Sequence, residues 1–99
     1  MNIKHLENLD NDNLFKAILT LKNVDECYMF FCDLFTPNEL NSISQRVQIA
    51  MELRKGDTFT NVCKNVKASS ATIARVKNQL IYGNDGLNLA LDRLQNEVK

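Results

Sequence analysis

The side chains in this sequence best suited to bind a ligand are four basic residues within residues 58–82. Lys64, Lys67, Arg75 and Lys77 lie in a stretch without any Asp or Glu, although the 99-residue chain has a formal net charge of zero. A local excess of positive charge on a neutral protein attracts phosphate without regard to sequence. An isolated surface lysine is usually only solvated, and the absence of acidic neighbours is what favours nucleic-acid binding here.

Side chains that could support catalysis or hold a metal are few and isolated. His5 is the only histidine and has no partner nearby in the sequence, and no glycine-rich phosphate loop is present. The cysteines, Cys27, Cys32 and Cys63, are odd in number and form no CxxC pair, which is typical of reduced thiols. Their spacing with His5 matches no usual zinc motif. We therefore expect neither an enzyme nor a metal site.

Composition predicts a single all-α domain over residues 1–99. Hydrophobic residues make up 44% and charged residues 24% of the chain, as in a folded globular protein. One Pro, three Gly and the lack of long apolar–polar alternation favour helices over strands. No apolar run approaches the roughly 20 residues that cross a bilayer, and the N-terminus lacks a signal-peptide core. We expect a cytoplasmic protein without membrane contact.

The basic segment has the pattern of a helix-turn-helix at about residues 58–80. Thr58 is expected to cap a helix over residues 59–66, and Ser69 or Ser70 a second one that continues through Leu80. Glycine is common at the position of Lys67 in such turns, so we expect a strained backbone there. Small or apolar residues occupy the places where the two helices cross: Val62, Cys63, Val66, Ala68, Ile73 and Val76. For Cys63 this predicts a packing role.

Two helices are predicted before this segment, and one chain offers little to cover the second. Helical spacing begins at Leu14 and predicts a helix over residues 13–21, with an earlier start as the alternative. The polar run 11–13 is its cap or a break, after a loose N-terminus. Residues 24–35 form the next helix, which is apolar around nearly its whole circumference. Such a helix must be covered on most sides. We favour two chains that wrap these helices around one another, and a central helix of a monomeric bundle is the alternative.

The third helix has the clearest start signal. Thr36 can cap it, Pro37 takes the first helical position, and Glu39 completes a capping box. Gly56 is expected to end it as a left-handed C-cap. The turn over residues 83–86 predicts one more helix, with an apolar stripe of Leu87, Leu91, Leu94 and Val98.

Several of these motifs together resemble the tryptophan repressor family over about Leu34 to Leu94. Four pieces occur in the family's order: the Thr-Pro-x-Glu opening at residues 36–39, the Arg46-Val47 pair, the Leu53 to Gly56 helix end and the Ala-Thr-Ile-x-Arg signature at residues 71–75. The ending from Tyr82 to Gly86 is similar to the TrpR-related YerC/YecD branch.

The resemblance implies a six-helix TrpR-like fold and an intertwined homodimer. Its two helix-turn-helix units would enter successive major grooves of a palindromic operator, about 34–36 Å apart. The implied function is a sequence-specific, DNA-binding transcriptional regulator of the repressor type.

The residues expected to contact double-stranded DNA belong to the helix-turn-helix: Thr58, Thr60, Lys64, Lys67, Ser69, Ser70, Ala71, Thr72, Ala74, Arg75, Lys77 and Asn78. The lysines would hold phosphates, while Arg75 or Asn78 could read a base edge. Ser70 and Thr72 could equally cap the helix or contact phosphate. Because alanines donate nothing, bridging water and DNA shape would contribute to recognition.

The resemblance also implies an effector pocket that involves Thr36, Arg46 and Arg75, where two guanidinium planes enclose an indole. Val76 stands where the family has glycine beside that ring, and a branched side chain there fills space. We expect no resident cofactor, and tryptophan fits poorly, although a smaller corepressor could use the arginines. The favoured alternative is that Arg46 bonds to helix-end carbonyls, and Arg75 to phosphate or an acid.

Two other functions share the predicted fold. A dimeric helical adaptor would bind proteins rather than DNA, but it would not need residues 58–82 to be free of acids. A DNA-binding head of the replication-initiator type is normally attached to a larger ATPase, which we do not expect for this chain.

Overall fold

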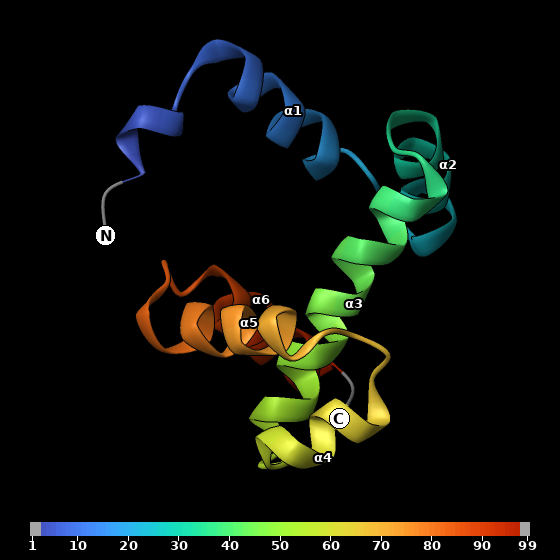
Figure 1. Ribbon diagram of the computed structural model, residues 1–99. Helices are drawn as coiled ribbons and strands as arrows, with labels where there is room; N and C mark the ends of the chain where they lie inside the picture. Colours follow the sequence, from blue (N-terminus) through green and yellow to red (C-terminus); the bar gives the residue numbers. More distant parts are fainter. Residues whose placement is uncertain (1–2, 98–99) are drawn as a thin grey trace. The chain divides into compact units, whose positions relative to one another are not determined.

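The structure is a computed structural model that describes residues 3–97, and this part of the chain is helical without strands (Figure 1). Its elements are the 3-10 turn η1 (Lys4–Leu6) and the helices α1 (Leu9–Leu19), α2 (Val24–Leu34), α3 (Pro37–Arg54), α4 (Phe59–Asn65), α5 (Ser70–Tyr82) and α6 (Gly86–Glu97). The chain gathers into two compact units, Met1–Leu40 and Asn41–Lys99. The prediction of one domain stays a prediction.

Asparagine caps set the starts of α1 and α2. The side-chain oxygen of Asn8 accepts the backbone N–H of Asn11 at 2.8 Å, and that of Asn23 accepts the N–H of Glu26 at 2.9 Å. Helix α1 therefore begins four residues earlier than predicted, and the expected cap or break at residues 11–13 is wrong. Asn11 does not interrupt the helix, because its side-chain amide donates back to the carbonyl of Leu6 at 2.6 Å. Residues 4–6 form the 3-10 turn rather than a loose end, and residues 1–2 lie outside the described residues.

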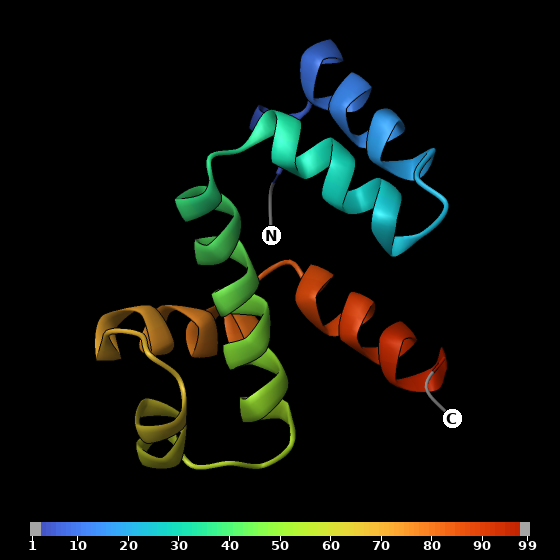
Figure 2. The same ribbon diagram turned by 90° about the vertical axis from the view of Figure 1, so that its right-hand side faces the viewer.

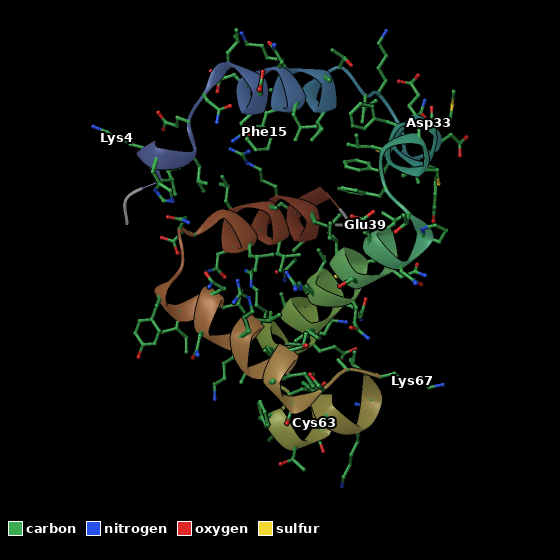
Figure 3. The ribbon with its side chains drawn as sticks, turned by 45° about the horizontal axis from the view of Figure 1, so that its top comes forward. Lys4, Phe15, Asp33, Glu39, Cys63 and Lys67 are labelled. Atoms are coloured by element: carbon green, nitrogen blue, oxygen red, sulfur yellow. The ribbon has the colours of Figure 1, made fainter. Side chains whose placement is uncertain are left out.

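The unit that contains α1 and α2 has no buried side chain within its described residues, 3–40. Leu19 is 82% exposed and Tyr28 62% exposed, and Figure 3 shows Phe15 projecting from α1. In α2 the ring of Phe31 contacts those of Phe30 and Phe35, with centroids 5.2 Å and 5.7 Å apart. These contacts lie along one helix and its end, so the unit lacks an apolar core of its own.

Helix α3 begins with the predicted capping box. Thr36 Oγ1 accepts the backbone N–H of Glu39 at 3.2 Å, and Glu39 Oε1 accepts the N–H of Thr36 at 2.9 Å. The backbone hydrogen bond from Thr36, and then that with its side chain, lower the pKa of Glu39 below its ordinary value of 4.5.

Helix α3 ends at a glycine, also as predicted. Gly56 has a φ of 93°, its N–H donates to Leu53 at 3.1 Å, and the N–H of Asp57 donates to Glu52 at 3.4 Å. These two bonds are those of a Schellman motif, which places a left-handed residue where only glycine is free of strain.

The apolar core lies in the second unit and joins four helices. Its buried side chains are Ile49 and Ala50 of α3, Val62 of α4, Ile73 and Val76 of α5, and Leu91 of α6. Cys63 packs against this cluster, as expected for a small residue at a helix crossing. The buried side chains of α3 are Ile49 and Ala50, whereas Ile43 is exposed.

The predicted stripe of α6 covers the core only in its first half. Leu87 and Leu91 pack there, Leu94 is exposed, and Val98 lies outside the described residues.

Polar links hold α6 against α3 and α5. Arg54 donates from Nη1 to the carbonyl of Asn88 at 3.1 Å and forms an ion pair with Asp92. The side-chain amide of Asn88 donates in turn to the carbonyl of Leu80 at 3.0 Å. The second unit is thus held by packing inside and by a polar chain at its edge.

Replacing Ile73 with Ala should lower the free energy of unfolding by about 2–5 kcal/mol, because it opens a cavity in a close-packed core. Ile81 is a matched control on the same helix: Ile73 is 0% exposed and Ile81 59% exposed. Ile81→Ala should lower the free energy of unfolding by less than about 1 kcal/mol. Chemical denaturation at one fixed chain concentration measures both, and equal losses would contradict the assigned core.

The capping carboxylate of Glu39 predicts a pH dependence of stability. Because its pKa is depressed in the folded chain, its contribution is present above the unfolded value and lost as the pH falls through the folded one. Glu39→Gln keeps the acceptor but cannot titrate. Between about pH 7 and about pH 3, the Tm of the original chain should fall further than that of this variant. If the Tm of both chains fell by the same amount, the pKa of Glu39 would not be lowered in the folded chain.

Candidate nucleic-acid interface

Hydroxyl caps begin both helices of the predicted helix-turn-helix. Thr58 Oγ1 accepts the backbone N–H of Asn61 at 3.1 Å, and Ser69 Oγ accepts the N–H of Thr72 at 3.1 Å. Each cap satisfies a backbone donor that the first turn of a helix leaves free. Figure 2 shows α4 and α5 joined by the connecting turn. Helix α4 is therefore Phe59–Asn65 and α5 Ser70–Tyr82, close to the predicted bounds.

The turn between these helices is not strained at Lys67, so that expectation is wrong. Asp85, with a φ of 66°, is the only non-glycine residue at positive φ in the described part of the chain. The N–H of Ala68 donates to the carbonyl of Val66 at 2.8 Å across Lys67. That bond is the mark of an inverse γ-turn, which holds its central residue at negative φ and so suits lysine.

Gln45 holds this turn in place, a role that sequence reasoning missed. Its side-chain amide donates to the carbonyl oxygen of Lys67, 22 residues away along the chain. The bond joins α3 to the turn, and the side chain of Lys67 extends outward from there (Figure 3). No local pattern marks Gln45, because a glutamine on a helix surface has no fixed partner until the chain folds.

Helix α5 has an inner and an outer side. Ile73 and Val76 are buried in the core and Leu80 is half-buried. At spacings of four, three and four residues, the opposite side is formed by exposed residues, which we call the outer stripe: Ala71, Arg75, Asn78 and Tyr82.

The structure leaves most of the predicted DNA-binding residues at the surface. Exposed are Thr58, Thr60, Lys64, Lys67, Ser69, Ser70, Ala71, Arg75, Lys77 and Asn78. Thr72 and Ala74 are half-buried on the flanks of α5. Ser69 Oγ and Thr72 Oγ1 also lie 3.0 Å apart and share a hydrogen bond, so both hydroxyls serve the start of the helix.

The basic side chains of this segment have no acidic partner among the side chains of residues 3–96. The ion pair between Arg54 and Asp92 involves no residue of this segment. Lys64 lies on α4, Lys67 in the turn, and Arg75 and Lys77 on α5, all exposed to solvent. Their positive charges are therefore available to an external anion.

Three residues of the predicted effector pocket differ in their surroundings: one caps a helix, one is exposed and one is buried in the core. The Thr36 hydroxyl caps α3, and Arg46 is exposed. Val76 is 3% exposed and belongs to the apolar core, so its branched side chain already fills its place. These observations do not fit an indole beside Val76, and the pocket itself stays a prediction.

Three further features of the described residues concern metal binding, disulfide bonds and membrane spans. No group of three or more His, Cys, Asp or Glu side chains there is arranged to hold a metal ion. The three cysteines are free. No helix of the described chain has the length and apolar character required to span a bilayer.

Comparison with known proteins agrees with this architecture. The Trp repressor protein family matches residues 9–95. The chain is 47% identical to the Bacillus subtilis (strain 168) protein YerC over 95 residues, which are 96% of this chain and 91% of that protein.

Two solved structures have the same fold. A candidate Trp repressor from Staphylococcus aureus superposes with a TM-score of 0.90 at 47% identity, over 96% of this chain and 95% of the other. A TrpR-like protein from Eubacterium eligens ATCC 27750 superposes with a TM-score of 0.87 at 43% identity, over 93% of this chain and 95% of the other. The predicted TrpR-like all-α fold and the resemblance are confirmed. The chain belongs to the Trp repressor family.

Proposed function

We propose that this protein is a sequence-specific DNA-binding transcriptional regulator of the repressor type, which binds palindromic duplex DNA as a homodimer. The observation that carries the proposal is the surface of α4, the turn and α5, where four basic side chains are exposed and unpaired in the described structure. The role is that of a regulator rather than an enzyme. It also implies the cytoplasm, since the regulator must meet the chromosome.

The shape of α5 suits the major groove. That groove is about 12 Å wide and accepts one α-helix. The inner side of α5 is anchored by Ile73 and Val76, so the outer stripe can face the base pairs without loss of packing. Lys64 and Lys67 precede the helix, where side chains can reach the phosphates that flank a groove.

A second copy of the chain is the partner that best covers α1 and α2. These helices have no buried residue, yet they carry many large apolar side chains. In a two-fold dimer the same apolar segments of both chains meet, so each copy supplies what the other lacks. Two recognition helices on that axis would read two half-sites, which is why the operator should be palindromic.

A small-molecule effector is not a required part of the proposal. The position that the resemblance places beside an indole is filled by Val76, inside the core. A protein-binding adaptor is the alternative function. That adaptor would gain nothing from a segment of 25 positions, 58–82, that contains basic side chains and no acidic ones.

Replacing both Lys64 and Lys67 with Ala should weaken binding to all duplexes and make the salt dependence shallower. Each lysine that neutralises a phosphate contributes about 0.9 to the slope of log affinity against log salt. Fluorescence anisotropy with random duplex DNA at several salt concentrations measures this slope. The double variant Lys16→Ala/Lys22→Ala is the matched control, since neither lysine belongs to the proposed DNA-binding surface of α4, the turn and α5. If the first pair behaves like the control pair, Lys64 and Lys67 do not contact DNA.

Replacing Leu34 with Asp should give an unfolded chain rather than a folded monomer. Leu34 is an exposed apolar residue of α2, and a shared core has no stable single-chain form. Leu34→Met keeps the apolar character and should remain a folded dimer. Sedimentation velocity with circular dichroism distinguishes the two results. A well-folded Leu34→Asp monomer would refute the interlocked dimer.

A further inference from the structure

We propose that Arg75 and Asn78 are the two side chains that read base identity in each half-site, whereas the other polar side chains of α5 hold the helix or the phosphates. This inference rests on the proposed function and assigns its specificity. The preferred targets are guanine for Arg75, through O6 and N7, and adenine for Asn78, through N6 and N7.

The hydroxyl groups near the start of α5 are the first competitors, and most are already used. Ser69 Oγ accepts the N–H of Thr72 at 3.1 Å and shares a 3.0 Å bond with the Thr72 hydroxyl. Thr58 Oγ1 likewise accepts the N–H of Asn61 at 3.1 Å. To read a base, each of these groups would have to give up a cap that starts its helix. Ser70 is exposed, but a rotating hydroxyl both donates and accepts and so discriminates bases poorly.

Between Ala71 and Tyr82, the outer stripe has two polar side chains, Arg75 and Asn78. Ala71 has no donor or acceptor in its side chain and can contribute only a methyl contact to thymine. Arg75 and Asn78 follow it at helical spacing, and both are exposed. Each presents a forked set of polar atoms, which is the geometry that a bidentate contact with a base edge requires.

Neither side chain is used within the described structure. Arg75 has no ion pair with any side chain of residues 3–96. Asn78 differs from Asn8, Asn23 and Asn88, whose side chains all form hydrogen bonds. Asparagine is also a weak helix former away from the caps. The side-chain amide of Asn78 is therefore exposed and free to bind an external partner.

The spacing of the two residues suits neighbouring base pairs. Three residues along an α-helix rise about 4.5 Å, and successive base pairs are about 3.4 Å apart. Lys77 lies between them in sequence, but it follows the buried Val76 and so falls on the flank of α5. There its single ammonium group can hold a phosphate, and it lacks the fork that specifies a base.

The test is selection of bound duplexes from a random pool by the full chain, followed by affinity measurements on single-base variants of the selected site. The original chain should select a palindrome. Asn78→Ala and Arg75→Ala should each lose the preference at one base pair per half-site, with discrimination there falling about 10-fold or more. Lys77→Ala should weaken binding to all DNA sequences alike, and this variant should select the same palindrome.

The possible results distinguish a failure of this inference from a failure of the proposed function. If the original chain selects no duplex and shows no salt-dependent binding, the proposed function and this inference both fail. If it selects a palindrome that Asn78→Ala and Arg75→Ala also select with undiminished preference, DNA binding stands and the assignment of the two readers is wrong. If Arg75→Ala weakened binding to all sequences equally, the assignment of Arg75 as a base reader would also be wrong, because this result would identify a phosphate contact.

Discussion

The burial of a few aliphatic side chains between α3, α4, α5 and α6 is the constraint on which the second unit depends. Ile73 and Val76 anchor one side of α5 to Ile49 and Val62, and this anchoring decides which residues of α5 face solvent. Because a packed interior tolerates little rearrangement, the outer stripe is fixed as firmly as the core beneath it. The basic charges and polar side chains need no further support to be held at the surface.

The first unit differs, because the apolar side chains of residues 3–40 are exposed or half-buried and none is buried. Its helices have well-formed caps at Asn8 and Asn23, so local structure is specified without a core. Helices of this length are marginal in isolation, and most of their stability must come from packing. One chain thus combines a unit that has its own apolar core with a unit whose helices have none.

Local signals in the sequence predicted much of this structure, and long-range contacts explain most of what they missed. The capping box at Thr36 and the C-cap at Gly56 depend on residues a few positions apart, and both occur as expected. The start of α1 was wrong because Asn8 caps before the polar run that seemed to break it. Gln45 was missed, since its partner in the turn is set only by the packing of α3. The Lys67 backbone was misjudged because a γ-turn bond replaced the expected glycine geometry.

The polar chain from Arg54 through Asn88 to Leu80 bears on how this molecule responds to its ionic surroundings. Dissolved ions screen the partly exposed attraction between Arg54 and Asp92. They have less effect on the neutral hydrogen bond between the Asn88 amide and the Leu80 carbonyl, and aliphatic packing does not depend on charge. Changes in electrolyte therefore alter the electric field outside α4 and α5 while the scaffold that shapes that field keeps its form.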